Sequence, residues 1–495
     1  MTATDIHDED AAHLASLGYS TEFRRDMSAW ANFSLGFTYL SPVAGVYTVF
    51  GFALMMAGPP MIWTLVIAGV GQLFVALVFS EIVAQYPVAG GVYPWARRLW
   101  GKEWAWLTGW VYMCALFATI AAVSYGSAPY VAAAFGIGNV SVNVIVLCAL
   151  AVLTLATVVN FLGTKALSLA AMLGFLAELS GALVVGLWLL IAHREHGLGI
   201  LVDSFGAASN GSYFWAFAAA ALLGIYQYYG FEACGDVAEE VPSPGTLIPK
   251  AMRRTIYIGG AAATWVTLAL VLAVTDIPAV IAGRDTTPVE TVLNQAFGHT
   301  GARVVLFVVL LSFLSCVISL QAAASRLAFS YGRDDMIMGS SLLKRFSAAR
   351  HIPPYALLLA GAVPALIVIG SKISTNATAK IVGFAALGVY LGFQMVVIAA
   401  LRARLKGWHP AGKFQLGRWG LLVNILALTW GIIGIICLVR PLGGPDVAWY
   451  DNWSVGLSGL IVIAIGLVYQ AVHPTAGRST APYDTAIPKA ADARH

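Results

Sequence analysis

Twelve long apolar segments constrain the fold of this chain more than any other feature of its sequence. A transmembrane helix needs about 20 mostly apolar residues, whereas membrane strands are short and alternate in polarity. Only 11% of the residues are charged, about half the share in a soluble domain. The predicted fold is therefore an all-α integral membrane bundle of twelve transmembrane helices. The apolar segments span residues 33–57, 60–85, 104–134, 141–162, 165–192, 213–238, 253–275, 302–330, 355–371, 379–401, 419–440 and 454–472.

The basic residues predict how the bundle is oriented. If the twelve segments alternate in direction, 22 of the 28 lysines and arginines fall on the side that holds both termini, and 6 fall on the other side. Cytoplasmic loops of membrane proteins carry this excess of positive charge. We therefore expect a multi-pass protein of the cell membrane with both termini in the cytoplasm. The net charge of +4 is too small to indicate nucleic acid as a partner.

Several other classes of function lack support in the sequence. The five cysteines all fall in apolar segments and read as small core residues rather than as a disulfide or metal framework. The histidines fall in loops and tails, so no His/Asp or metal constellation lies within the membrane segments. We expect no enzyme activity, no cofactor and no metal.

The first apolar segment contains helix-breaking residues at its centre. The stretch "SPVAG" places Ser41, Pro42 and Gly45 there. Proline lacks the backbone N–H and clashes with the preceding turn, and glycine tolerates unusual dihedral angles. A break within hydrocarbon persists only where protein or a water-filled cavity surrounds it. An ordinary kink is the alternative interpretation.

A second interruption lies in the sixth segment and favours a binding site over a kink. Its sequence "AALLGIYQYYGFEACGDVAEEVPSPG" places Gly230, Gly235 and the acids Glu232 and Asp236 among tyrosines. Ionisable groups at membrane depth are costly and usually functional. Paired interruptions at matching places in two five-helix halves indicate an inverted-repeat transporter with a central site. Half-helix N-termini can bind a carboxylate, and aromatic rings can cover an ammonium group.

Several motifs resemble the amino acid–polyamine–organocation (APC) permeases, which share the leucine-transporter fold. They are "SEIVAQYPVAGGVYPWARRLWG", "YYGFEACGDVAEEVPSPGTLIPKAM", "NFLGTK" and "SRLAFSYGRDD". The stretches "LASLGYSTEFRRDMSAWANFSLGF" and "GKFQLGRWGLLVNILALTW" are similar to the amino acid/choline transporter branch. The resemblance implies a 5+5 inverted repeat with discontinuous helices 1 and 6, plus two further helices.

This resemblance divides the chain into five parts. We expect polar cytoplasmic tails at 1–30 and 474–495, both mobile. The first repeat would occupy 31–195, the second 210–402, and the two additional helices 415–473.

The resemblance also implies a substrate site at the two interruptions. Val43, Ala44 and Gly45 would present backbone amides to a carboxylate, although many relatives have Gly-Ser-Gly there. Tyr226 would be an aromatic gate, and residues 230–232 would be unwound. The predicted substrate-binding residues are Ser41, Pro42, Val43, Ala44, Gly45, Val46, Tyr226, Tyr229, Gly230, Phe231 and Glu232.

Coupling to an ion gradient is predicted at three polar residues. Glu178 lies deep in the fifth segment, where proton-coupled relatives tend to carry a lysine, and we hypothesise that it takes up and releases a proton. A structural, hydrogen-bonded carboxyl is the alternative. Ser312 and Ser315 in the eighth segment, with Ser319, offer oxygen ligands to sodium or simply pack helices together. Proton and sodium coupling both remain open.

Charged residues near the predicted cytoplasmic helix ends suggest ion pairs that close an inner gate. They are Glu81, Arg97, Arg98, Glu239, Glu240 and Arg333.

The predicted function is secondary active transport of a small amino acid or related amine, such as 4-aminobutyrate, choline or a polyamine. Proton-coupled import or exchange by alternating access is favoured. The partners are then the solute, a coupling proton or sodium ion, and the lipid bilayer. The alternative is a nutrient sensor that binds its ligand without moving it, although such sensors usually have a long signalling tail.

Overall fold

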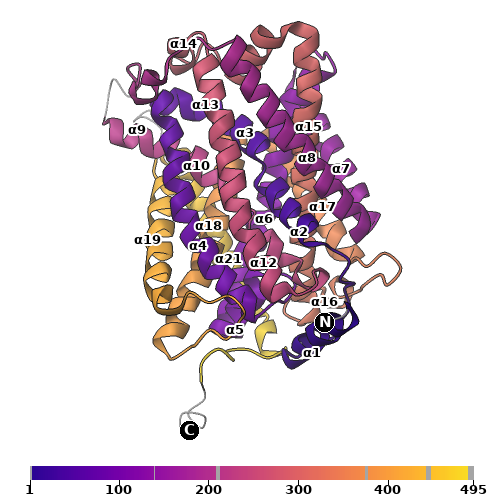
Figure 1. Ribbon diagram of the computed structural model, residues 1–495. Helices are drawn as coiled ribbons and strands as arrows, with labels where there is room; N and C mark the ends of the chain where they lie inside the picture. Colours follow the sequence, from indigo (N-terminus) through magenta and orange to yellow (C-terminus); the bar gives the residue numbers. More distant parts are fainter. Residues whose placement is uncertain (1–2, 139, 208–211, 374–376, 442–446, 489–495) are drawn as a thin grey trace.

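Long helices that run between two ends of one bundle dominate the structure (Figure 1). The computed structural model describes residues 3–138, 140–207, 212–373, 377–441 and 447–488. Helices make up 77% of the structure. Within the described ranges no strand forms, and one isolated bridge joins Ser347 to Ile352. The predicted all-α architecture is confirmed.

Ten helical segments of the described chain are long and apolar enough to cross a membrane. The first of these segments joins two helices end to end. The segment that corresponds to the predicted span 253–275 contains a π-helical turn at Thr255–Gly259. The helices that form these ten segments are α2 (Ala29–Leu40) with α3 (Pro42–Ala57), α4 (Trp63–Gln85), α6 (Lys102–Ala134), α7 (Val142–Phe161), α8 (Thr164–Ala192), α12 (Pro244–Arg254) with α13 (Gly260–Ala273), α15 (Pro288–Arg333), α18 (Ala377–Leu405), α19 (Gly420–Val439) and α21 (Ser454–Val472).

The two other predicted spans form shorter apolar helices. Segment 355–371 becomes α17 (Pro354–Gly370), which has 17 residues. Segment 213–238 divides into α9 (Tyr213–Ala220), α10 (Leu222–Gln227) and α11 (Ala233–Asp236). Length and composition therefore support ten of the twelve predicted crossings.

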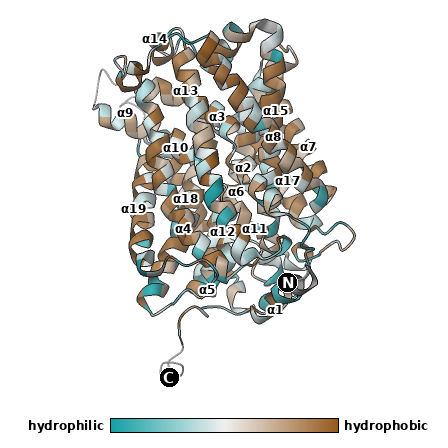
Figure 2. Cartoon of the chain, in the orientation of Figure 1, coloured by the Kyte–Doolittle hydropathy of each residue, from teal (hydrophilic) through white to brown (hydrophobic). Residues whose placement is uncertain are grey.

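The packing order places α6 inside the bundle and several other helices at its outer surface. Helix α6 contacts α18, α15 and α7, whereas α8 contacts α15, α13 and α2. On α7, α8, α19 and α21, large aliphatic side chains such as Leu147 and Ile432 are exposed. Figure 2 shows that hydrophobic residues cover the length of the bundle. Such surfaces are stable where lipid tails, rather than water, cover them.

The described parts of both tails lie at the same end of the bundle (Figure 1). That end also carries α1 (Ala3–Ser16), α5 (Val92–Leu99) and α16 (Ser340–Leu343), and the opposite end carries α9 and α14 (Ile277–Ile281). We call them the terminal end and the distal end.

The described parts of the tails pack against the bundle, which differs from the mobility that we expected. The Met27 amide donates to the Glu240 carbonyl at 3.0 Å. The Asp484 amide donates to the Arg97 carbonyl at 2.8 Å. Backbone pairing of this kind gives polar tail sequences a fixed place without an apolar helix.

Candidate functional site

The first predicted interruption is a sharp break at a single residue. Ser41 has φ 44° and ψ 85°, which ends α2 and begins α3. A residue before proline is driven out of the helical region, and Pro42 then occupies the first turn of α3, where no N–H is needed. Val43 to Gly45 are therefore helical, so the unwound residue is Ser41 itself.

The second interruption is longer. The chain leaves the helix after Gln227, and residues 228–232 lie outside any helix until α11 begins at Ala233. Gly230 has φ 110°, which L side chains rarely adopt. The Gln72 side chain donates to the free Tyr228 carbonyl at 2.8 Å. The predicted unwound stretch 230–232 thus lies within the observed one.

The two breaks cross one another in direct contact. A Cβ atom added to Gly230 would lie 2.6 Å from the backbone nitrogen of Leu40, just before the first break. The Gln227 side chain donates to the Leu40 carbonyl at 3.1 Å. The Asn32 side chain on α2 donates to the Cys234 carbonyl on α11 at 2.9 Å. The breaks are therefore one structural unit inside the bundle.

The amides predicted to bind a substrate carboxylate have partners within the protein. The Val43 amide donates to Glu178 Oε1 at 2.9 Å, and the Ser41 hydroxyl donates to the same oxygen at 2.6 Å. The Ala44 amide donates to Ser41 Oγ at 3.2 Å, and the Gly45 amide to the Ser41 carbonyl at 2.9 Å. The structure thus brings Glu178 of α8 to the N-terminus of α3.

Glu232 is anchored at the second break. Its carboxylate accepts from the Gly230 amide at 2.7 Å and from the Tyr112 hydroxyl at 3.0 Å. The side chain of Asp236, one turn further, is fully buried, and neither of its oxygens has a hydrogen-bond partner among the described residues. Within the described chain, no ion pair includes Glu178, Glu232 or Asp236. The centre of the bundle therefore favours a positively charged group.

Aromatic rings lie beside these acids. Tyr226 and Tyr229 meet edge to face, with ring centroids 5.4 Å apart, and Tyr39 approaches Tyr229 at 6.1 Å. Phe231 instead packs against Phe393 at 5.5 Å. Sequence reasoning missed Tyr39 and Tyr112. Tyr39 lies two residues before the "SPVAG" stretch, which was a usable signal, whereas nothing near Tyr112 in sequence points to the sixth segment.

The serines of α15 bond within their own helix. The Ser312 hydroxyl donates to the Val308 carbonyl at 3.2 Å, and the Ser315 hydroxyl donates to the Ser312 carbonyl at 3.0 Å. Ser319 Oγ lies 2.8 Å from Thr38 Oγ1 on α2. These contacts are the ones expected of serines that pack helices together.

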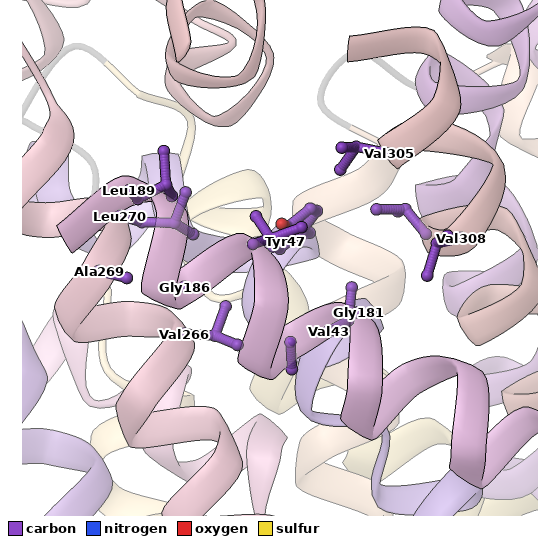
Figure 3. A pocket seen from close by; sticks show the side chains of 13 residues that line it. Val43, Tyr47, Gly181, Gly186, Leu189, Val266, Ala269, Leu270, Val305 and Val308 are labelled. Atoms are coloured by element: carbon purple, nitrogen blue, oxygen red, sulfur yellow. The ribbon is translucent and has the colours of Figure 1, made fainter. Parts of the chain in front are cut away.

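Cavities lie at both ends of the bundle: one of about 540 Å³ at the terminal end is lined by Asp335 and Tyr469 among others, and two at the distal end are lined in part by residues 283–290. A void of about 10 Å³ is lined by Val43, Tyr47 and Gly181, among others (Figure 3). That volume holds about one water molecule. A larger cavity of about 350 Å³ is lined by Tyr47, Tyr130 and residues 286–290. Space for a solute therefore exists beyond the breaks, toward the distal end.

Buried ion pairs close the terminal end. Arg326 contacts Glu240 at 2.8 Å and Arg333 contacts Glu239 at 3.0 Å. Three of these four side chains are about 1% exposed and Arg333 is 10% exposed. The Thr164 hydroxyl also donates to Glu240 at 2.9 Å. These contacts tie the chain after the second break to α15 and α8.

The six charged residues that were predicted to close an inner gate do not all pair with one another. Glu239 and Arg333 pair with each other, but Glu81 pairs with Arg404 and Arg98 donates to the Leu17 carbonyl. Arg97 lies 3.9 Å from Asp334, a residue that sequence reasoning did not include.

The N-terminal tail also contributes to this closure. The Tyr19 hydroxyl donates to Asp334 at 3.1 Å. Burial, followed by the nearby Asp334 carboxylate, raises the pKa of Tyr19, so this hydroxyl remains a donor.

Two solved structures of one manganese transporter share this arrangement of helices. A manganese transporter from Eremococcus coleocola aligns with a TM-score of 0.58 over 91% of this chain and 94% of its own, at 14% identity. A mutant form of that transporter aligns with a TM-score of 0.56 at 13% identity. These likenesses show the fold. The chain therefore has the leucine-transporter-like fold of these structures.

Sequence comparison gives the family. The profile described as "Amino acid permease" matches residues 28–474. Amino-acid permease BAT1 of Arabidopsis thaliana is 25% identical over 94% of this chain and 96% of its own length. Its homolog in Oryza sativa is 25% identical over 93% and 94%. This chain belongs to the amino acid permease family of the APC superfamily, which confirms the resemblance and its assignment as a transporter rather than an enzyme.

The close crossing of the breaks makes Gly230 sensitive to substitution. In Gly230→Ala, the left-handed backbone and the contact with the Leu40 nitrogen should together cost about 1–3 kcal/mol or more. We expect the thermal unfolding temperature in detergent to fall by several degrees. The control is Gly370→Ala, where an added Cβ meets nothing within 4 Å. Equal unfolding temperatures for the two variants would contradict the crossing.

The buried pairs at the terminal end generate a second expectation. Glu240→Gln leaves the Arg326 guanidinium buried without its carboxylate, which should cost about 3–5 kcal/mol. The exposed pair of Lys344 and Asp335 provides the control, because Lys344→Ala should cost at most about 1 kcal/mol. Fluorescence-monitored unfolding of both purified variants measures the difference. A Glu240→Gln protein as stable as Lys344→Ala would show that the pair does not hold this end closed.

Proposed function

We propose that the protein is a secondary active transporter that moves a small amino acid or a related amine by alternating access. The observation that carries this proposal is the direct crossing of two interrupted helices beside buried acids and tyrosines. The names of the relatives in Arabidopsis thaliana and Oryza sativa support amino acids as the class of solute. Twelve crossings would include two inverted five-helix repeats, with the breaks in the first helix of each.

The proposed substrate site lies between the two breaks. Its ammonium-binding side comprises Glu232 with the rings of Tyr226 and Tyr229, because an acid and aromatic faces together attract a cation. Its other side is the N-terminus of α3 at residues 41–46, whose helix dipole favours a carboxylate. A zwitterionic amino acid fits both sides, and an amine fits the first alone.

The closed terminal end and the cavities at the distal end are consistent with one state of an alternating-access cycle. A solute would enter through the cavity beside Tyr47 and reach the breaks from the distal side. Breaking the pairs of Arg326 and Arg333 would then open the terminal end. The charge distribution favours the cytoplasm for that end, so the cycle would import its solute or exchange it across the cell membrane.

Coupling is proposed at Glu178, which combines full burial with direct contact to the first break. Ser312 and Ser315 remain candidate sodium ligands only if their present intrahelical bonds are released. Proton coupling is therefore the reading that the contacts favour.

A ligand screen tests this proposal. The purified protein is heated with each of the 20 proteinogenic amino acids, 4-aminobutyrate, choline and polyamines. A ligand at 100 times its Kd should stabilise the folded state by about 2.7 kcal/mol. Uptake of that labelled ligand into vesicles then separates a transporter from a sensor, because only the transporter accumulates it unchanged. Binding without uptake would favour the sensor.

Tyr226 should contribute to affinity for the ligand found in this way. Tyr226→Ala removes a ring from the ammonium side of the site, at a cost of about 0.5–2 kcal/mol, which is about two- to thirtyfold in Kd. The matched control is Tyr450→Ala, since Tyr450 is 59% exposed and far from the breaks in sequence. Equal Kd values in titrations of the two variants would exclude Tyr226 from the site.

A further inference from the structure

The N-terminus of α3 is already occupied by a carboxyl group of the protein itself. Helix α3 has 16 residues, and its first turn directs backbone N–H groups and the positive end of its dipole toward Glu178. Glu178 Oε1 accepts from the Val43 amide at 2.9 Å and from the Ser41 hydroxyl at 2.6 Å. This is the arrangement by which helix N-termini bind carboxylate ligands.

The second oxygen of the Glu178 carboxyl group accepts no hydrogen bond from the described residues. Glu178 is fully buried, and its Oε2 has no hydrogen-bond partner among the described residues. The void of about 10 Å³ that Val43 lines is bordered largely by apolar side chains such as Val185 and Val308. The attachment to α3 is therefore what chiefly stabilises a negative charge on Glu178.

Among the side chains that the structure describes, the helices packed against α8 supply no fixed counter-charge near Glu178. Cys316 on α15 is close enough to interact electrostatically with it, and Tyr47 on α3 lines the void beside Val43. The other described thiol and phenol groups on packed helices are Tyr39 on α2, Cys148 on α7 and Tyr331 near the end of α15, while α13 has none. Thiol and phenol groups are uncharged at neutral pH. The charged side chains described on α15 lie toward its ends: Glu290, Arg303, Arg326 and Arg333.

Two carboxylates cannot occupy this N-terminus together. It offers the Val43 amide and the Ser41 hydroxyl to one oxygen, and two negative charges within a few ångströms repel strongly in a buried site. A substrate carboxylate must therefore displace Glu178. Once displaced, Glu178 would lose both donors while still buried, and an unpaired buried carboxylate is far more costly than a neutral acid.

We propose that Glu178 is an internal ligand of the α3 N-terminus, which a substrate carboxylate replaces as Glu178 takes up one proton. The inference deepens the proposed function and rests on it. The balance is simple: the Val43 N–H changes acceptors, and a proton from water forms an O–H bond on Glu178. Glu178 is thus a specificity-determining residue that links the binding of each carboxylate to one proton.

The pH dependence follows from this exchange. At low pH, a neutral Glu178 competes weakly for α3, so amino acids bind most tightly. Above the pH at which Glu178 ionises in the free protein, each unit of pH should weaken amino acid binding by up to tenfold. An amine that lacks a carboxylate does not compete for α3, so its affinity should not show this slope.

The first test compares such ligands on the intact protein. Kd is measured between pH 5.5 and 9.5 for each amino acid that binds, and for the amine left when its carboxyl group is removed. A slope for the amino acid alone supports the proposal, and equal slopes or no slope overturn it. If no amino acid, 4-aminobutyrate, choline or polyamine binds or is transported, the proposed function itself fails.

The second test uses variants. Glu178→Gln keeps the size and a neutral acceptor, so amino acid binding should lose its pH slope and be tighter than wild type at the highest pH tested, where Glu178 is ionised. Cys316→Ala removes the facing thiol and should keep the wild-type slope. A slope that persists in Glu178→Gln, or that disappears in Cys316→Ala instead, overturns the proposal. Should Glu178→Gln fail to fold, the comparison of amino acids with amines on the wild type still decides.

Discussion

The structure depends on side chains that hydrogen-bond to the free backbone groups at two places where the chain leaves the helix. Water would satisfy these groups in a soluble protein, but both places lie inside an apolar bundle. An unsatisfied peptide group in such a medium costs several kcal/mol. The replacements follow a simple division of chemistry. Carboxamide side chains donate to the free carbonyls, and carboxylates accept from the free amides, where the helix dipole favours negative charge. The side chains concerned are Asn32, Gln72 and Gln227 for the carbonyls of Cys234, Tyr228 and Leu40, and Glu178 and Glu232 for the amides of Val43 and Gly230.

Local sequence was sufficient to predict where the breaks occur, but not what they contact. Pro42 excludes a helical conformation at the preceding residue, and Gly230 permits a backbone that other residues avoid, so both breaks are local properties. The partners of the breaks come from helices far away in the chain, and no local pattern connects Gln72 or Tyr112 to the sixth segment. The same reason explains why Glu178 was recognised as a buried acid while its attachment to α3 was not.

The two ends of the bundle differ in a way that composition alone could not predict. Ion pairs between predicted cytoplasmic helix ends would contribute little in water, yet Glu240 and Arg326 are both about 1% exposed. Their burial results partly from the tails, because Met27 and the residues around it cover the chain after the second break. Helix length alone does not identify all twelve predicted spans. A broken helix such as α10 with α11 is too short to be recognised by length, although it lies at the centre of the bundle.

At the first break the acceptor is an ionisable side chain, Glu178, so the charge beside the Val43 amide can change. A glutamine at position 178 would also accept from the Val43 N–H, just as Gln227 satisfies the Leu40 carbonyl without any charge. The two carboxylates at the breaks are not equivalent either. Glu232 uses both oxygens, on Gly230 and Tyr112, whereas Glu178 leaves Oε2 bare. Neutralising Glu232 would weaken two internal bonds. Neutralising Glu178 weakens only its hold on α3, so of these two acids it is Glu178 whose charge can be removed while the crossing of the breaks stays intact.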